Sequence, residues 1–359
     1  MCDPVVYILP GSGGYLVGQV AGLIAFMRAS AKAPLICMST SGGNIAGYAA
    51  HAGQWTESGT RRVINALRPE IFAVPWNRAP WLRWIPSWLI GVFNTSFYTA
   101  NPHGAPEALF ETVLDPSTLS SVEMWTGTVN EKCKKAQLFC NRSAENAILK
   151  SNAGTDLADA QLGSLPPIYL DGDIETLGAV ALASASIPTL VPSVNIKGQK
   201  YFDGGDAYAS PFPLLKSRLR HWVGTRPIHF VRFAGYNAEN YKYAKKDTNI
   251  LGVGLNSIAT LQCSLCLLDR QTAIDMVAID GCPIDYEDGV LDPATVNDFI
   301  TRRRDTCTRS LVEVYPAVDL SVDIVSFAPG DISKAVDSLL APGMLRYRCW
   351  SSTKVNINV

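Results

Sequence analysis

The chain has 359 residues, of which 47% are hydrophobic and 18% are charged, and its formal net charge is −1. This length and composition are typical of a globular protein with a sizeable core. The nearly neutral charge argues against a protein that binds nucleic acid through bulk positive charge. No run approaches the ~18 apolar residues of a transmembrane helix, and no basic segment followed by an apolar one predicts a signal peptide.

The nine cysteines have no spacing typical of a disulfide framework, which favours reduced thiols and a cytoplasmic location. Cys263 and Cys266 form a C-x-x-C pair, but the surrounding residues 261–271 have a helical pattern. We therefore interpret the pair as thiols packed in the core, with a metal or redox pair as the alternative. Any contact with a membrane is expected to be peripheral.

Short apolar runs alternate with helical patterns from the start of the chain. A strand is predicted at 5–9 and a second at 34–39, and each is followed closely by a helix. Such repeats with short connections predict parallel strands covered by helices. The remaining predicted strands are 136–141, 167–172, 227–235 and 322–329, and the predicted helices are 18–30, 44–53, 174–186, 252–272 and 294–314.

The last predicted helix has a favourable start, because Asp292 is a good N-cap and Pro293 suits the first helical turn. Its three arginines at 302–304 are interpreted as a solvated helix face. Residues 70–106 are irregular and rich in proline and tryptophan, which predicts a cap or lid insertion. We expect a single domain over 1–359, in which residues 240–359 complete or extend the core.

The segment STSGG at 39–43 lies between the second predicted strand and the following helix. A nucleophilic serine on such a turn needs small neighbours, so that strand and helix approach closely around a strained apex. The usual pattern is G-x-S-x-G, and Ser39 replaces its first glycine here. The register places Ser41 at the apex, because β-branching makes Thr40 a poorer occupant of a strained turn. The segment alone is equally compatible with a plain turn that caps a helix.

Glycines directly follow the first predicted strand in the segment LPGSGGYLVGQ. Gly11, Gly13 and Gly14 allow backbone N–H groups to point towards an anion. A dinucleotide site would need a third glycine where Leu16 stands and an acidic residue about twenty residues on, and residues 28–56 contain none. We therefore favour an oxyanion hole formed by backbone amides, with a nucleotide-binding module as the alternative.

An aspartate stands on a glycine turn, DGG at 203–205, after a predicted pair of short strands. The approach from residue 181 is a small-residue helix that stops before Pro188. The other Asp-Gly pairs of the chain lack the second glycine. Asp203 is therefore the candidate to orient and deprotonate Ser41.

Together these segments resemble the patatin-like phospholipase family. The resemblance rests on the glycine-rich loop, the serine elbow, the segment ASASIPTLVPSV and the Asp-Gly-Gly turn, which occur in the family's order. It covers roughly residues 5–53 and 174–215. It implies a patatin-like α/β fold, a three-layer α/β/α sandwich with a mostly parallel central sheet, and a lipid acyl hydrolase of the phospholipase A or lysophospholipase type.

The resemblance also implies a Ser–Asp dyad without a catalytic histidine. Ser41 would be the nucleophile and Asp203 the base of a single catalytic domain that forms an acyl-serine intermediate. It implies no metal or organic cofactor, and the expected partners are a lipid substrate and a peripheral membrane surface. Tyr15 and Leu16 stand where the family usually has a basic residue. The residues whose backbone amides would bind the oxyanion are Gly11, Ser12, Gly13, Gly14 and Gly42.

A Ser–Asp–His esterase or lipase is the alternative among hydrolases. It needs a histidine, and His221 and His229 follow Asp203 in the chain. His229 lies within a predicted strand and is interpreted as a packed side chain, and His221 stands near a predicted helix end. His51 and His103 are interpreted as structural.

Four of the eight tryptophans lie between residues 76 and 88. Trp81, Trp84 and Trp88 have near-helical spacing, and tryptophan is favoured at a boundary between water and lipid. We predict that these side chains belong to a lid that contacts a lipid surface, with a cap packed onto the core as the alternative.

Overall fold

The computed structural model describes residues 5–29, 31–68, 74–75, 98–99, 122–188, 191–224, 226–239, 250–278, 283–301, 307–320 and 330–353. The strands are β1 (Val5–Leu9), β2 (Ile36–Ser39), β3 (Val74–Pro75), β4 (Tyr98–Thr99), β5 (Glu123–Asn130), β6 (Ala136–Cys140), β7 (Ile168–Tyr169), β8 (Val194–Ile196), β9 (Gln199–Asp203), β10 (Ile228–Phe233), β11 (Ile284–Val290), β12 (Cys307–Pro316) and β13 (Leu345–Thr353). The α-helices are α1 (Leu16–Arg28), α2 (Ser41–Ala52), α3 (Glu57–Ala66), α7 (Ala153–Gln161), α8 (Ile174–Ser184), α9 (Lys216–Val223), α10 (Ile250–Val277), α11 (Pro293–Thr301) and α13 (Asp331–Leu339), with short 3-10 turns η1 (Gly13–Tyr15) and η4 (Gly204–Asp206).

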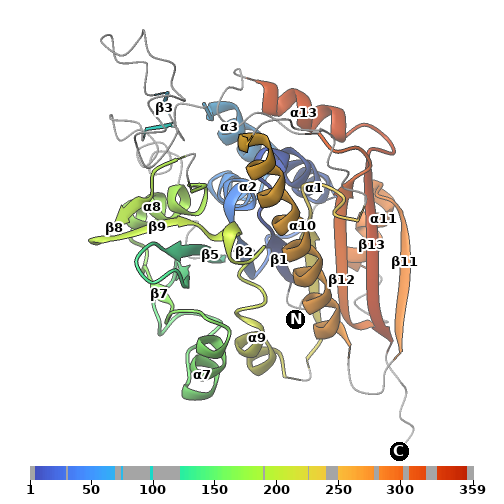
Figure 1. The fold of residues 1–359 in the computed structure, drawn as a ribbon. Helices are drawn as coiled ribbons and strands as arrows, with labels where there is room; N and C mark the ends of the chain where they lie inside the picture. Colours follow the sequence, from blue (N-terminus) through green and yellow to red (C-terminus); the bar gives the residue numbers. More distant parts are fainter. Residues whose placement is uncertain are drawn as a thin grey trace, which may run out of the picture.

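One large sheet runs through the molecule in the strand order β11-β13-β12-β10-β1-β2-β5-β6-β7, and β9 joins β5 to β8 (Figure 1). The five central strands, from β12 to β5, run parallel. The pairs β12–β13, β13–β11, β5–β6, β5–β9 and β9–β8 are antiparallel. The chain is therefore an α/β protein whose sheet is parallel at its centre.

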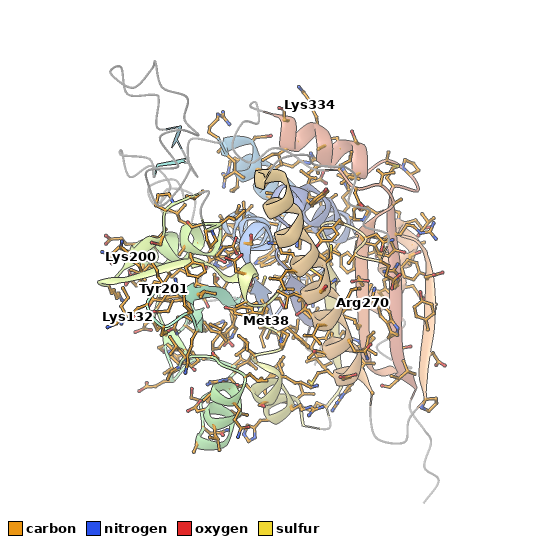
Figure 2. The ribbon with its side chains drawn as sticks, viewed as in Figure 1. Met38, Lys132, Lys200, Tyr201, Arg270 and Lys334 are labelled. Carbon is orange, nitrogen blue, oxygen red and sulfur yellow. The ribbon has the colours of Figure 1, made fainter. Side chains whose placement is uncertain are left out.

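Helices cover both faces of the sheet because each strand alternates its side chains between two apolar cores. In β1, Tyr7 and Leu9 enter one core, which α1, α2, α3, α8, α11 and α13 close. Val6 and Ile8 enter the other core, which α9 and the end of α10 close. Met38 of β2 belongs to this second core and lies near the middle of the molecule in Figure 2. The arrangement is compatible with the predicted three-layer sandwich.

Several predicted elements are present in the structure with bounds close to those predicted. The strand at 5–9 is β1, the helix at 174–186 is α8, and the helix at 252–272 is the longer α10. The start of α11 is also as predicted, since the Thr295 amide donates to the Asp292 carboxylate at 2.7 Å and Pro293 opens the helix.

The predicted helix at 294–314 is wrong beyond its first part. It ends with α11 at Thr301, and Cys307–Pro316 forms β12, which lies between β10 and β13. Val312, Val314 and Tyr315 are the residue types that strands favour, and pairing with strands distant in sequence outweighs the helical pattern. Residues 302–304 and the predicted strand at 322–329 lie outside the described residues. Strands β5, β11 and β13 were not predicted.

The carboxyl ends of the parallel strands meet at one edge of the sheet, where β1 leads into η1 and β2 leads into α2. In open α/β sheets this edge is where ligands bind. None of the helices in the described ranges has both the length and the apolar character that crossing a membrane requires.

Candidate active site

Ser41 stands at the junction of β2 and α2. Thr40 is extended, with φ −146° and ψ 146°. Ser41 has a φ of 55°, which lies in the left-handed region that is strained for a residue with a Cβ. The serine that the sequence places at the apex of the turn is thus a residue with strained backbone.

The glycines after Ser41 are required by the close approach of the β1–α1 loop. A Cβ at Gly43 would lie 2.3 Å from the carbonyl oxygen of Leu9, and a Cβ at Gly42 would lie 2.5 Å from that of Gly13. Both distances are far below a van der Waals contact, so a side chain at either position would push the loop away. The glycine loop therefore lies directly against the first turn of α2.

Asp203, the last residue of β9, contacts Ser41 directly. The Ser41 Oγ donates a hydrogen bond to the Asp203 Oδ2 at 2.6 Å. The Gly205 amide donates to the Oδ1 of the same carboxylate at 2.7 Å. Each of the two residues is 1% exposed, so the pair lies in surroundings from which bulk water is largely excluded.

The environment of Asp203 shifts its titration towards neutral pH. Burial raises the pKa of Asp203 to about 7, although hydrogen bonds from Ser41 and Gly205 oppose the rise. The neighbouring Asp206 carboxylate contributes to the rise, and burial raises the pKa of Asp206 itself to about 6. A carboxylate with a pKa near neutrality is a stronger base towards a hydroxyl than a free aspartate, whose pKa is about 3.9.

The backbone amides predicted for the oxyanion hole are not all available. The Gly11 amide donates to the carbonyl oxygen of Ala209 at 2.7 Å, so Gly11 supplies close packing instead. A Cβ at Gly11 would lie 3.4 Å from that of Ser41. Within the described part of the chain, no hydrogen bond engages the amides of Gly13 and Gly42. The same holds for the amides of Ser12 and Gly14.

Side chains outside the predicted dyad and oxyanion hole hold the turn at Ser41 in place. The Ser41 amide donates to the Ser184 Oγ at 3.0 Å, and that hydroxyl donates to the Gly127 carbonyl oxygen at 2.7 Å. The Ser39 Oγ donates to the Asn44 Oδ1 at 3.0 Å. The serine that replaces the first glycine of the usual pattern thus forms its own hydrogen bond. Ser184 lies in the alanine- and serine-rich segment on which the resemblance partly rests. That segment was the sequence signal that pointed to Ser184.

A second buried chain of hydrogen bonds shapes the glycine loop. The Ser12 Oγ donates to the Gln19 Oε1 at 2.7 Å, and the Gln19 Nε2 donates to the Pro10 carbonyl oxygen at 2.7 Å. Gln19 is fully buried, and the other buried residues of α1 are all apolar. This glutamine ties both sides of the loop to α1.

The described histidines lie away from the dyad. His229 is opposite Val5, at the amino end of β1, whereas Ser41 follows the strand beside the carboxyl end of β1. His51 is buried, which lowers its pKa to about 4, and it lies ten positions after Ser41, about 15 Å along the helix. His221 is exposed at the end of α9. None of the three donates to the carboxylate that Ser41 contacts.

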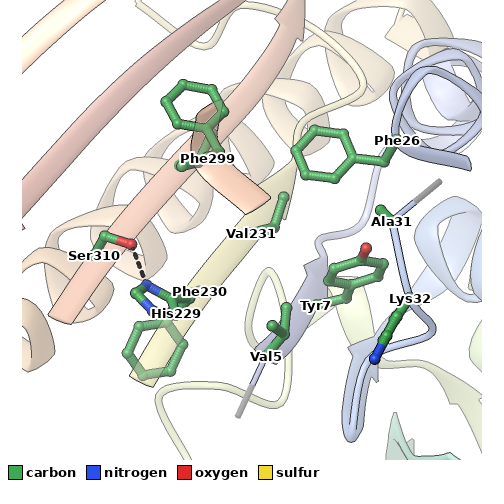
Figure 3. Close-up of a pocket in the computed structure, with 11 residues that line it drawn as sticks. Val5, Tyr7, Phe26, Ala31, Lys32, His229, Phe230, Val231, Phe299 and Ser310 are labelled. Carbon is green, nitrogen blue, oxygen red and sulfur yellow. Dashed lines mark hydrogen bonds between the residues drawn. The ribbon is translucent and has the colours of Figure 1, made fainter. Parts of the chain in front are cut away.

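Three cavities also lie away from the dyad. One of about 50 Å³ is lined by Tyr7 and Phe26 together with His229, whose Nδ1 is 2.8 Å from the Ser310 Oγ (Figure 3). A second of about 460 Å³ lies between α1, α11 and α13, and a third of about 640 Å³ lies beside Tyr347. The dyad residues line none of these cavities.

The C-x-x-C pair lies on α10, beside the glycine loop. Cys263 and Cys266 are both buried, and each Sγ is 3.6 Å from the Tyr236 hydroxyl. The Cys266 Sγ also lies 4.0 Å from the Gly11 carbonyl oxygen. The described residues hold no cluster of three side chains suited to bind a metal. The prediction of packed thiols is confirmed by their burial.

Of the predicted lid at 70–106, the structure describes only the antiparallel pair β3 and β4, and Trp81, Trp84, Trp88 and His103 lie outside the described residues. Comparison of the chain with protein-family models and with curated proteins finds no match. The fold is that of an α/β protein with a mostly parallel central sheet, in which Ser41 stands at a strained strand-to-helix turn.

Proposed function

We propose that the chain is a serine carboxylic ester hydrolase that acts on lipids, with Ser41 as the nucleophile and Asp203 as its base. The observation that carries the proposal is the 2.6 Å hydrogen bond between Ser41 Oγ and Asp203 Oδ2 at a strained strand-to-helix turn. A nucleophile within hydrogen-bond reach of its base is the geometry that covalent catalysis needs. The absence of a histidine at this carboxylate, among the described residues, favours a dyad over the Ser–Asp–His triad.

In the first half of the reaction the ionised Asp203 accepts the proton of Ser41 as Oγ forms a bond to the ester carbonyl carbon. The carbonyl electron pair moves onto its oxygen, and the amides of Gly13, Gly14 and Gly42 are the proposed donors to this oxyanion. A donor of this kind typically stabilises the transition state by about 3–4 kcal/mol. The bond to the alcohol then breaks, and the alcohol leaves with the proton from Asp203.

In the second half water takes the place of the alcohol. Asp203 accepts a proton from the water as the water oxygen attacks the acyl-serine carbonyl carbon. Collapse of the second tetrahedral intermediate breaks the bond to Ser41 Oγ, which regains a proton, and the carboxylic acid is released. The raised pKa of Asp203, about 7, suits a group that must accept and return a proton near neutral pH.

The lipid substrate class follows from the patatin-like resemblance, and the phospholipase A or lysophospholipase activity with it. The glycine loop contacts the serine elbow closely, through Gly13 against Gly42, and this contact favours an oxyanion hole over a nucleotide site. Both members of the dyad are 1% exposed. A substrate ester therefore reaches them only when covering groups move, as in enzymes that close over their substrates.

Labelling with a fluorophosphonate probe tests the nucleophile. The intact chain is expected to be labelled, and Ser41→Ala to lose the label. Ser310→Ala is the matched control, because Ser310 is also buried and hydrogen-bonded. Its partner is His229, near the amino ends of the parallel strands and away from Ser41. Retained labelling of Ser41→Ala, or loss of labelling in the folded control, would refute the assignment. Release of fatty acid from phospholipid and lysophospholipid by the intact chain then tests the substrate class.

A further inference from the structure

Two hairpins end side by side next to the candidate active site. The β5–β6 turn spans 131–135, and the β8–β9 turn contains residues 197 and 198. The Glu131 amide donates to the Lys200 carbonyl oxygen at 2.9 Å, which joins the two tips. Both tips carry exposed lysines, Lys132 and Lys200 being labelled in Figure 2. We call the following five residues the lysine surface: Lys132, Lys134, Lys135, Lys197 and Lys200.

Most of the positive charge on this surface is not neutralised. Lys197 forms an ion pair with Asp173 at 3.0 Å. Lys134 Nζ lies 5.2 Å from the centre of the Phe202 ring, a cation–π contact that holds its ammonium group in place. Within the described residues, the other three lysines form no ion pair with a carboxylate. The neighbouring Glu131 carboxylate accepts a hydrogen bond from the Ser193 Oγ at 2.9 Å, and the five lysines outnumber the two carboxylates of Glu131 and Asp173 beside them.

The lysine surface lies at the same edge of the sheet as the dyad. Thr126 of β5 is opposite Ser39, the last residue of β2, and β5 then continues to Asn130, about 13 Å further. The hairpin tips therefore project beyond the edge at which α2 begins. On β9, Lys200 and Asp203 are three residues apart, about 10 Å along the strand. Because side chains alternate along a strand, those of Lys200 and Asp203 leave opposite faces of β9, so the lysines lie near the dyad without facing it.

We propose that the lysine surface docks the protein on an anionic lipid membrane and so brings the candidate active site to its substrate. Charge complementarity carries this choice, because the net charge of the whole chain is −1 whereas these five lysines gather at the tips of two adjacent hairpins. The location of the docking surface is independent of the chemistry, but its role in lipid turnover rests on the proposed function.

The chemistry of lysine fits a lipid surface better than a single bound phosphate. A lysine ammonium is a compact, strongly hydrated point charge, whereas a built phosphate site more often uses the planar fork of arginine. Each lysine near an anionic membrane strengthens binding about fivefold, and the contributions of several lysines add as free energies. Exposed charges of this kind are also screened by salt.

Sedimentation with phosphatidylcholine vesicles, with and without phosphatidylserine, tests the proposal. The full chain carries Ser41→Ala in every sample, so that turnover does not alter the vesicles. Lys132→Gln/Lys135→Gln removes two charges from the lysine surface. Lys150→Gln/Lys334→Gln is the control, since it removes two exposed lysines elsewhere. Lys132→Arg/Lys135→Arg keeps the charge.

Binding is expected only when phosphatidylserine is present and to weaken as salt is raised. The Gln pair at the hairpin is expected to bind about 10- to 30-fold more weakly, whereas the control and the Arg pair bind like the parent. Equal losses in both Gln pairs, or equal binding to neutral vesicles, would overturn the proposal. So would tight binding of single-stranded DNA or polyglutamate in the absence of vesicle binding, which would assign the surface to another partner.

A separate assay distinguishes this proposal from the proposed function. Hydrolysis of a soluble short-chain ester is measured with Ser41 intact, in chains that carry either Gln pair. If the ester is hydrolysed equally by both pairs, the hairpin lysines act in docking rather than in chemistry. Reduced hydrolysis by the hairpin pair alone would refute a pure docking role. If no chain hydrolyses an ester while vesicle binding still depends on Lys132 and Lys135, the hydrolase assignment fails and the docking surface stands.

Discussion

Replacing Asp203 by asparagine is expected to change how the stability of the protein depends on pH. The side chains are nearly the same size, and an asparagine amide oxygen can still accept a hydrogen bond from Ser41. The substitution mainly removes a titratable group whose pKa is raised by burial to about 7 in the folded chain. In the unfolded chain an aspartate titrates near 3.9.

The sign of the effect follows from proton binding. Between about pH 4 and pH 7 the folded chain holds a proton on Asp203 that the unfolded chain has lost, so the stability of the parent falls as pH rises. The contribution of this proton to the free energy of unfolding is fully present below pH 4 and lost once the pH exceeds about 7. A difference of about three pKa units at about 1.4 kcal/mol each gives about 4 kcal/mol.

Urea unfolding of the parent and of Asp203→Asn, followed by circular dichroism from pH 4 to pH 8.5, measures this contribution. The free energy of unfolding of the variant minus that of the parent is expected to rise by about 4 kcal/mol between pH 4 and pH 8. With an unfolding slope of about 3 kcal/mol per molar urea, the gap between the two midpoints changes by about 1 M. Comparing one pH with another cancels any constant effect of the altered hydrogen bond.

The control is Asp285→Asn, because Asp285 is exposed on β11. Its difference from the parent is expected to stay constant over the same range. A constant difference for Asp203→Asn would refute the reasoning, because Asp203 would then titrate like a free aspartate. A parent that gains stability over Asp203→Asn as pH rises would do the same, since it would indicate a lowered pKa. Either result would also weaken the case for Asp203 as a base near neutral pH.

Three further outcomes are expected. If the chain hydrolyses esters, the rate should rise with pH through a midpoint of about 7 as Asp203 ionises, and a midpoint near 4 in a pH–rate profile would contradict this. Ser184→Ala removes the acceptor of the Ser41 amide and should lower kcat by roughly tenfold, about 1–2 kcal/mol; an unchanged kcat in the folded variant would show that the elbow does not need this bond. His51→Ala and His229→Ala should keep most of the esterase turnover, and loss of activity in a folded His229→Ala chain would favour a triad.

The sequence determined the features that depend on neighbours along the chain. Small residues around position 41 predict a tight strand-to-helix turn, and the φ of 55° at Ser41 agrees with that prediction. The helix start at Asp292 and Pro293 was predicted from capping preferences, because capping is a contact between residues three positions apart. The first strand was predicted from a short apolar run followed by a glycine cluster.

Only the tertiary structure decided the features that depend on residues far apart. The 2.6 Å contact between Ser41 and Asp203 joins residues 162 positions apart, and the raised pKa of Asp203 reflects burial by segments that no local pattern describes. The same limit explains why the glycine pattern predicts an oxyanion-hole role for the Gly11 amide, which in the structure donates to the Ala209 carbonyl oxygen. It also explains why the local pattern at 294–314 predicts a helix over most of β12. Strand pairing and desolvation are set by partners that arrive from elsewhere in the chain, so their outcome is decided only when the sheet has formed.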